Sequence, residues 1–136
     1  MVADDHKLFA DGLCGLLATQ PDFEVIGKAF DGKEVLHFLN GKQPEVLIMD
    51  LNMPILDGQT AAEKILKLFP EIKILMLSMY SALSFCNNLQ SIGVKGYLPK
   101  DTDAELLFSV IREISSGNSY FRQQENCIPA LNRFAE

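Results

Sequence analysis

Short continuous apolar runs alternate along the chain with longer segments of helical spacing. The runs are rich in valine, isoleucine and leucine and lack polar alternation, as strands buried on both faces do. They are Phe23–Ala29, Val46–Met49, Ile72–Leu77 and Val94–Leu98. We therefore predict that these segments form the strands of a covered parallel sheet.

Between the runs, apolar residues recur three or four positions apart, which is typical of amphipathic helices. The stripes are Phe9/Leu13/Leu16/Leu17, Val35/Phe38/Leu39, Ala61/Ile65/Leu68/Phe69 and Leu107/Val110/Ile111/Ile114. Residues Ser81–Ser91 form the weakest helical pattern, because two asparagines interrupt its apolar face. Thr102 with Glu105 is a capping-box pattern that predicts the start of the last helix, and Gly117 predicts its end.

Strands that alternate with helices predict a doubly wound α/β domain, with right-handed crossovers and helices on both faces of a parallel sheet. A length of 136 residues with 48% hydrophobic residues fits one such domain. We place the domain at residues 1–117 and a tail or linker at residues 118–136.

The amino-acid composition argues against several classes of function. The net charge of −6 disfavours DNA binding by this segment, since DNA-binding surfaces are basic. The three cysteines form no CxxC pair and the two histidines complete no zinc pattern. No apolar run is long enough for a membrane helix, and the N-terminus lacks signal-peptide character. We expect a soluble, cytoplasmic protein.

Chemically active side chains stand where the predicted strands end. Asp4 and Asp5 follow the first residues of the chain, Asp50 follows Val46–Met49 directly, and Ser78 and Lys100 follow the last two strands. In an open α/β sheet, ligands bind beyond the carboxyl ends of the strands. Each residue alone is most simply a turn residue, a helix cap or a solvated charge. Together, three carboxylates, a hydroxyl and an amine at one edge predict a site.

Three clustered carboxylates repel one another unless a cation lies among them. Oxygen ligands with open positions suit Mg²⁺, with Mn²⁺ as an alternative. A carboxylate beside such a metal can attack a phosphoryl group and form an acyl phosphate. The Lys100 ammonium and the Ser78 hydroxyl would then meet the phosphoryl oxygens.

At these positions the sequence resembles the receiver domain of two-component response regulators. The likeness spans Ala3 to about Gly117, and its DDH opening and GYLPKD ending resemble the LuxR-type subgroup. The matching pieces are Asp4-Asp5-His6, Asp50-Leu51-Asn52-Met53-Pro54 with Asp57-Gly58, Ser78, and Gly96-Tyr97-Leu98-Pro99-Lys100-Asp101. The resemblance implies a flavodoxin-like, five-stranded sheet of order 2-1-3-4-5.

The resemblance also implies a metal site. Asp50 would be the phosphoacceptor. Asp5, Asp50 and the main-chain carbonyl of Asn52 would hold the metal, and Asp4 would assist, partly through water.

Three further residues would respond to the phosphoryl group. Lys100 would bind a phosphoryl oxygen, Ser78 would move toward the group, and Tyr97 would rotate inward to fill the vacated space. The packed surface would thereby switch between two arrangements.

The implied partners are those of a signalling switch. A histidine kinase or a small phosphodonor would supply the phosphoryl group. The phosphorylated domain would form a homodimer through either its last two helices with the fifth strand or its first and last helices. DNA would be bound only through a separate helix-turn-helix output domain, for which the residues after Gly117 are too few.

Three features depart from the family pattern. Only Met1–Ala3 precede Asp4, so we expect an unusually short first strand and exposed edges on its neighbours. The explanations are a chain that lacks its natural start, which we favour, a compromised sheet, or a partner that supplies the pairing. Met79 after Ser78 is bulky and would slow phosphoryl entry or hydrolysis. The proline of this region precedes the lysine rather than following it.

Three other functions compete with the switch. A phosphatase with an aspartyl-phosphate intermediate favours a second acid two residues after the nucleophile, where this chain has Asn52. A degenerate receiver would be an interaction module independent of phosphorylation. A nucleotide-binding module would need a glycine-rich phosphate motif, which does not occur. We therefore expect no enzyme, only autocatalytic phosphoryl acceptance and slow dephosphorylation.

Overall fold

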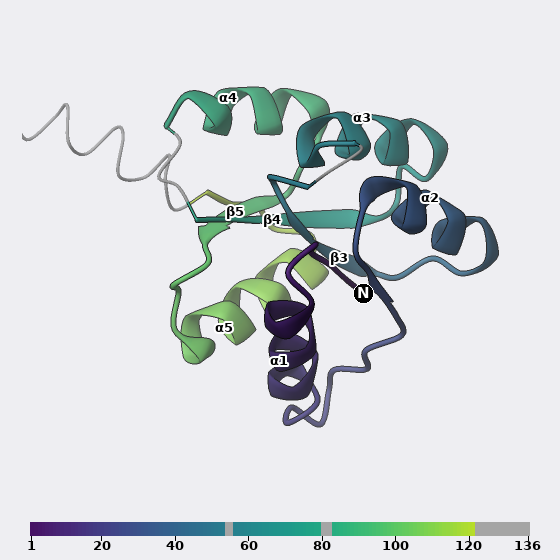
Figure 1. Ribbon diagram of the computed structural model, residues 1–136. Coiled ribbons are helices and arrows are strands. Elements are labelled where there is room, and N and C mark those ends of the chain that lie inside the picture. The colour runs from purple at the N-terminus through teal and green to yellow at the C-terminus, as the bar shows by residue number, and fades with distance from the viewer. Residues whose placement is uncertain (54–55, 80–82, 122–136) are drawn as a thin grey trace, which may run out of the picture.

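The structure, a computed structural model, describes residues 1–53, 56–79 and 83–121, and only the backbone of residues 83–87. Its centre is one parallel sheet of six strands in the order β2-β1-β3-β4-β5-β6 (Figure 1). The strands are β1 Val2–Ala3, β2 Lys28–Ala29, β3 Val46–Asp50, β4 Lys73–Ser78, β5 Gly96–Pro99 and β6 Tyr120–Phe121.

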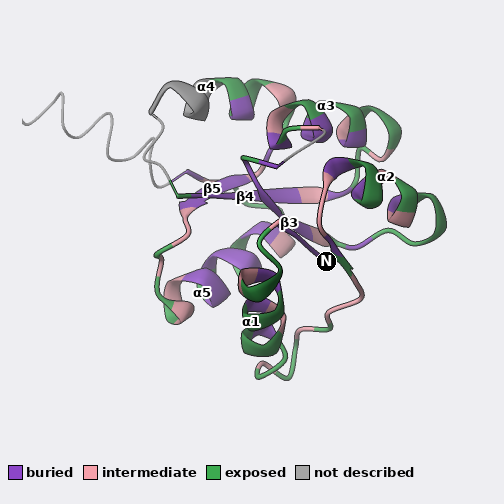
Figure 2. Cartoon of the chain, viewed as in Figure 1, coloured by how far each residue is buried: buried purple, intermediate pink, exposed green. Residues whose placement is uncertain are grey.

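Helices cover both faces of the sheet. Helices α1 and α5 lie on one face, and α2, α3 and α4 lie on the other (Figure 1). Each face has its own apolar core, and the buried residues follow the strands and the inner sides of the helices (Figure 2). The helices are α1 Lys7–Leu17, α2 Gly32–Gly41, α3 Gly58–Leu68, α4 Leu83–Ile92 and α5 Ala104–Ser115.

The predicted fold class and the strand order 2-1-3-4-5 are confirmed, but the predicted number of strands is wrong. The sixth strand, Tyr120–Phe121, pairs with β5 and lies in the segment predicted as a tail. Its two residues are too few to carry a periodic pattern. The division at residue 117 stays a prediction.

The first strand is as short as the sequence predicts. Val2 and Ala3 are each 1% exposed and pair with β2 on one side and β3 on the other. The strand predicted at Phe23–Ala29 is reduced to Lys28–Ala29, because a strand needs a partner and β1 offers only two residues. Residues 23–26 therefore keep the composition of a strand without its pairing, while the Gly27 carbonyl still accepts a hydrogen bond from the Val2 N–H at 3.1 Å.

The last helix begins one residue later than predicted. Asp103, not Thr102, is its N-cap, and its carboxylate accepts a hydrogen bond from the backbone N–H of Leu106 at 2.9 Å. The Thr102 hydroxyl instead donates to the carbonyl of Pro99. Gly117 ends the helix as predicted, with a φ of +101° that favours glycine.

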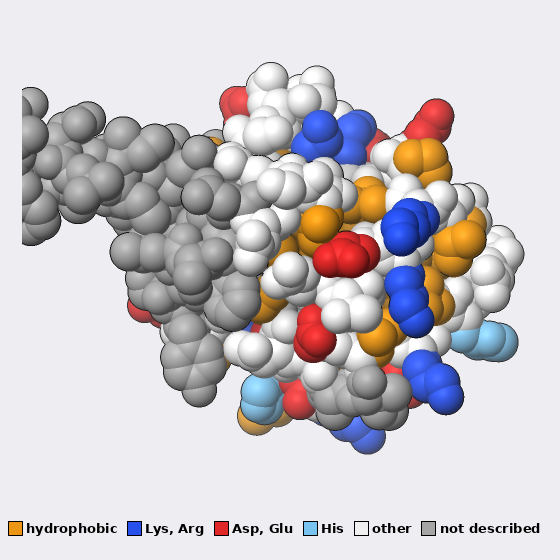
Figure 3. Space-filling model, turned by 90° about the horizontal axis from the view of Figure 1, so that it is seen from above, with side chains coloured by type: hydrophobic (Ala, Val, Ile, Leu, Met, Phe, Trp, Pro, Cys, Tyr) orange, Lys and Arg blue, Asp and Glu red, His pale blue; other side chains and the backbone are white. Residues whose placement is uncertain are grey.

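On the face of the sheet covered by α2, α3 and α4, helices α2 and α3 carry both acidic and basic side chains, with apolar side chains between them, whereas the sequence of α4 contains no charged residue (Figure 3). Among the described residues, no helix is long and apolar enough to cross a membrane.

Candidate functional site

The predicted site residues meet at the carboxyl edge of the sheet. Asp4 and Asp5 follow β1, Asp50 ends β3, Ser78 ends β4, and Lys100 follows β5. The parallel register brings these ends together, because Met49 pairs with Ala3 and Ser78 pairs with Pro99.

A buried lysine lies between two buried aspartates. The Nζ atom of Lys100 is 2.7 Å from an Asp4 oxygen and 3.2 Å from an Asp50 oxygen. The side chains of Lys100, Asp4 and Asp50 are 6%, 2% and 3% exposed, so water screens these ion pairs little. The ring of Phe9 adds a cation–π contact, with its centroid 4.7 Å from the same nitrogen.

Asp4, Asp5, His6 and Asp50 form an acidic group that can accept a cation. One ligand atom from each lies within 4.8 Å of the others. Asp5 Oδ1 is buried and accepts no hydrogen bond from the described residues; its neighbour is His6 Nδ1 at 3.5 Å. Because a buried carboxylate oxygen without a donor is costly, this arrangement fits a divalent cation with oxygen ligands.

The loop after β3 fixes the orientation of Asp50. The backbone N–H of Asn52 donates to Asp50 Oδ1 at 3.2 Å, while the other carboxylate oxygen meets Lys100. Gly58 begins α3 directly against this loop, and a Cβ atom there would lie 2.5 Å from the Asp50 carbonyl oxygen. Asp57 caps α3 by accepting from the backbone N–H of Thr60 at 2.9 Å. The loop is thus held at both ends.

Ser78 and Tyr97 are both fully buried, at the end of β4 and within β5. The carbonyl of Ser78 accepts a hydrogen bond from the backbone N–H of Lys100 at 2.8 Å, which ties the ends of β4 and β5 together. Met79, which the sequence predicts to obstruct the site, is 71% exposed. Tyr97 lies in the core shared with α2 and α3, the inward position that the sequence predicts for one state of the switch.

Burial governs the electrostatics of the site. Burial raises the pKa of Asp50 and the Asp4 charge adds to the rise, although the Asn52 N–H and Lys100 oppose it. Burial alone would lower the pKa of Lys100, but the hydrogen bonds and charges of Asp4 and Asp50 outweigh it and raise this pKa. The lysine is therefore firmly cationic, and an ionised Asp50 is held at some cost.

Three residues at the site have no predicted individual role. Phe9 contacts Lys100, Gly58 packs on the Asp50 backbone, and the His6 ring lies between Asp4 and Asp5. The sequence signal for His6 is its position directly after the two aspartates. For Phe9 and Gly58 the signal depends on distances in space, so periodicity alone assigns them to a helix face and a turn.

The parallel sheet, the helices on both faces and the acidic group at the carboxyl edge define a flavodoxin-like α/β domain with a ligand site at this edge. The family model of the response regulator receiver domain matches residues 1–112. The chain belongs to this family, whose members are signalling modules rather than classical enzymes.

Curated proteins that this chain resembles are regulatory proteins of bacteria. The transcriptional regulatory protein DegU of Brevibacillus brevis is 32% identical over 120 residues, covering 88% of this chain and 51% of that protein. The oxygen regulatory protein NreC of Staphylococcus carnosus is 39% identical over 121 residues, covering 88% of this chain and 56% of that protein. The chain thus spans about half the length of these relatives.

A solved structure shares the fold over the whole chain. It is a LuxR-family two-component response regulator from Aurantimonas sp. SI85-9A1, with a TM-score of 0.88 and 24% identity. The match covers 100% of this chain and 96% of that one. At this identity the likeness concerns the fold alone.

Proposed function

We propose that this receiver domain is a phosphorylation switch in which Asp50 accepts the phosphoryl group. One observation carries the proposal: the buried Asp50 carboxylate lies beside the Lys100 ammonium and within the acidic group of Asp4 and Asp5. A carboxylate oxygen attacks phosphorus, the bond to the donor breaks, and an aspartyl phosphate forms on Asp50.

The acidic group would hold Mg²⁺ or Mn²⁺. Asp5, Asp50 and the main-chain carbonyl of Asn52 would be direct ligands, and Asp4 would assist through water. The unsatisfied Asp5 oxygen supports this assignment. When bound, the cation supplies charge that stabilises the transferring phosphoryl oxygens.

Lys100 and Ser78 complete the phosphoryl site. Lys100 is paired with Asp4 and Asp50 and is close enough to follow a phosphoryl group placed on Asp50. Ser78 would donate its hydroxyl to a second oxygen, and Tyr97 would stabilise the switched arrangement by filling space in the core. Hydrolysis of the aspartyl phosphate would be slow and autocatalytic.

Partners follow from this role. We propose a histidine kinase or a small phosphodonor as the phosphoryl source. The names of DegU and NreC, of which this chain spans about half, support a transcriptional or other regulatory output. We also propose a homodimer on phosphorylation. On α1, Leu8 is 87% and Leu16 is 38% exposed, which supports an interface that includes α1.

The test combines intact mass with oligomeric state. The protein is incubated with Mg²⁺ and acetyl phosphate or beryllofluoride, beside Asp50→Asn and, as a matched control, Asp57→Asn. Asp57 is an exposed neighbour, and asparagine keeps its capping role. We expect a labile phosphoryl adduct and a beryllofluoride response that Asp50→Asn removes and Asp57→Asn keeps.

The opposite result would support a degenerate receiver, which acts as an interaction module independent of phosphorylation. A wild-type protein with no adduct, no beryllofluoride response and no Mg²⁺-dependent rise in melting temperature would be an interaction module. A response that survives in Asp50→Asn would place the acceptor elsewhere.

A further inference from the structure

The sixth strand is a short segment that returns along β5 after the last helix. Gly117, with a φ of +101°, ends α5, and the chain then turns back toward the sheet. The backbone N–H of Tyr120 donates to the carbonyl of Lys95 at 2.8 Å. We call the two residues of β6, Tyr120 and Phe121, the strap, because they lie along the edge of β5 that no other strand covers.

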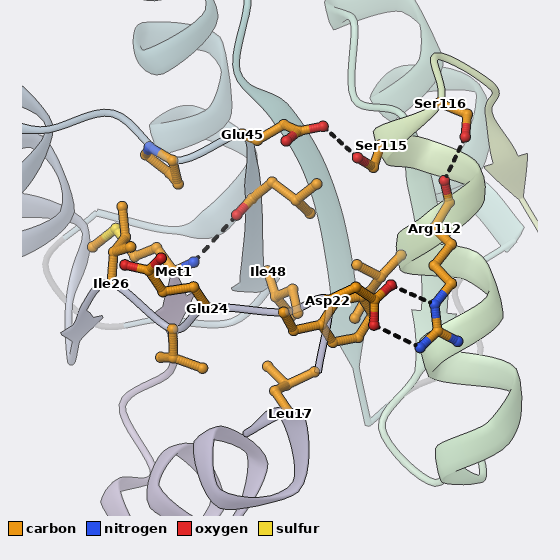
Figure 4. Close-up of a pocket in the computed structure, with 15 residues that line it drawn as sticks. Met1, Leu17, Asp22, Glu24, Ile26, Glu45, Ile48, Arg112, Ser115 and Ser116 are labelled. Carbon is orange, nitrogen blue, oxygen red and sulfur yellow. Dashed lines mark hydrogen bonds and ion pairs between the residues drawn. The ribbon is translucent and has the colours of Figure 1, made fainter. Parts of the chain in front are cut away.

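The end of α5, from which the strap departs, is held by several side chains (Figure 4). The Arg112 guanidinium pairs with Asp22 at 2.9 Å, and the Ser116 hydroxyl donates to the carbonyl of Arg112 at 2.9 Å. The Ser115 hydroxyl donates to the carboxylate of Glu45. These contacts tie α5 to the segments that precede β2 and β3, so the strap can loosen without moving the helix that carries it.

The two side chains of the strap lie on opposite faces of the sheet. Tyr120 pairs with Gly96 and packs, partly buried, on the core of α1 and α5. Phe121 pairs with Tyr97, is 5% exposed, and shares with Tyr97 the core on the other face. Adjacent strands lie about 4.8 Å apart and their paired residues project to the same face, so Phe121 is a packing neighbour of Tyr97.

The strap fits closely on β5 because position 96 is a glycine. A Cβ atom there would lie 3.0 Å from the carbonyl oxygen of Tyr120 and 2.7 Å from Cδ1 of Ile114. The free energy of docking is nevertheless small. Only two residues pair, and the cost of ordering their backbone is comparable to the stabilisation from burying one phenylalanine ring. A change in the position of Tyr97 can therefore shift the equilibrium between the docked and the undocked strap.

We propose that the strap is a regulatory element whose docking on β5 follows the position of Tyr97. In the structure Tyr97 is fully buried and the strap is docked, so these two arrangements belong together. Rotation of the Tyr97 ring out of the core removes a packing neighbour of Phe121 and loosens the strap. The state of the switch thereby reaches the chain that follows residue 121.

The inference rests on the proposed function, in which a phosphoryl group on Asp50 favours the inward position of Tyr97. Phosphorylation then tightens the strap, because it favours the arrangement in which Phe121 keeps its neighbour. By linkage, a docked strap favours the phosphorylated arrangement by the same factor. Both directions can be measured.

Amide hydrogen exchange of Tyr120 measures docking, because its N–H is bonded to the Lys95 carbonyl when the strap is in place. The Lys42 N–H, bonded to the Phe38 carbonyl at 3.1 Å at the end of α2, is the control for general stabilisation. With Mg²⁺ and beryllofluoride, the Tyr120 amide should exchange about five-fold or more slowly relative to Lys42. An unchanged ratio, or faster exchange, in a protein that binds beryllofluoride would overturn the proposal.

Truncation of phenylalanine tests the reverse direction. Phe121→Ala should weaken beryllofluoride binding by about five-fold or more, as measured by NMR titration, and Phe121→Leu should restore it because leucine keeps an apolar side chain beside Tyr97. Phe108→Ala is an equal truncation at 6% exposure in the core of the other face, and it should leave the affinity unchanged. Equal losses in the two alanine variants would mean that Phe121 acts through general stability alone, which contradicts the proposal.

A ligand-free comparison separates the strap from the phosphorylation switch. Tyr97→Ala removes the neighbour of Phe121 and should speed exchange at Tyr120 by about five-fold or more relative to Lys42; if this variant does not fold, Tyr97→Leu takes its place. The same ratio as in the wild type would sink the strap proposal. If the wild type binds no beryllofluoride, the proposed function fails, and this comparison alone decides whether the strap follows Tyr97.

Discussion

Lys100 makes three contacts at once, with Asp4, Asp50 and the Phe9 ring. A phosphoryl group on Asp50 would compete with Asp4 for this ammonium. The aromatic ring lies against the ammonium without carrying charge, so it can hold the lysine near Asp50 without competing for the phosphoryl group. Phe9 is therefore a positioning residue for Lys100.

We expect Phe9→Leu to slow phosphorylation by acetyl phosphate by about two- to thirty-fold, because a cation–π contact contributes about 0.5 kcal/mol when exposed and about 2 kcal/mol when desolvated, as around the buried Lys100 ammonium. Phe9→Tyr keeps the ring face and should keep the rate. The time course of the phosphoryl adduct by intact mass measures both. Equal rates for the leucine and tyrosine variants would show that the ring acts only through packing.

Asp50 links stability to pH. Its pKa in the folded chain is raised from the ordinary value of 3.8, mainly by burial. Above pH 3.8 the folded state therefore retains this proton longer than the unfolded state, and the contribution of Asp50 to the free energy of unfolding falls as pH rises.

The Asp50→Asn variant has no carboxyl group at this position, so its free energy of unfolding lacks this decrease with rising pH. In EDTA, Asp50→Asn should be more stable than the wild type at pH 7, and the difference should shrink toward pH 4. Urea unfolding of both proteins at pH 7 and pH 4 measures this difference in the free energy of unfolding. A difference that grows on acidification would mean that the Lys100 pair outweighs the burial of the carboxylate.

At the scale of the elements, the junction between β3 and α3 is the most constrained part of the site. The helix starts so close to the Asp50 loop that only glycine fits at position 58. By contrast, a Cβ atom at Gly15, in the exposed part of α1, would meet nothing within 4 Å.

The two glycines should respond oppositely to the same substitution. Gly58→Ala should destabilise the domain by about 1–3 kcal/mol, because the added methyl forces the backbone apart. Gly15→Ala should stabilise it by about 0.5–1 kcal/mol through helix propensity. Chemical denaturation compares them. If Gly58→Ala is as stable as the wild type, the loop after β3 moves away from the added methyl more readily than this packing implies.

A sequence pattern predicts a strand or helix correctly where its local composition agrees with the pairing that the fold offers. The buried strand at Val46–Met49 is found as β3, since a partner lies on each side of it. The apolar residues Phe23, Val25 and Ile26 also predict a strand but lie outside β2, because pairing there depends on how far β1 extends and not on their own composition. The N-cap predicted for α5 is wrong for a similar reason. Thr102 and Asp103 are both residue types that favour an N-cap position, and the backbone geometry places Asp103 there.

The residues of the candidate site also divide into those that the sequence predicts and those that only the structure reveals. Its charged residues are predictable because the carboxyl ends of parallel strands meet at one edge. The Phe9 contact and the unsatisfied Asp5 oxygen depend on side-chain geometry that a linear pattern does not contain.

At the scale of the whole molecule, α1 carries an apolar surface on the side of α5. A hollow of about 340 Å³ is lined by Leu8, Gly12 and Leu16 from α1, by Leu107 from α5 and by Thr102 just before α5. Leu8 stands exposed at its border, so one face offers both a protruding side chain and a cavity. Such a face can pair with its own copy around a two-fold axis.

We expect Leu8→Asp to abolish the beryllofluoride-dependent dimer, because a carboxylate in an apolar interface stays unpaired. Leu68→Asp changes an exposed leucine on α3 and should leave the dimer intact. Sedimentation velocity distinguishes monomer from dimer. A dimer that survives Leu8→Asp would point to the face of α4, β5 and α5.

The brevity of β1 has a thermodynamic consequence. Asp4 and Asp5 directly follow this strand of two residues, and Asp50 ends its neighbour β3. A cation held by Asp5 and Asp50 would join these two strand ends, so its binding would add to the free energy that keeps β1 in the sheet. By reciprocity, any change that stabilises the docking of β1 must in turn favour cation binding.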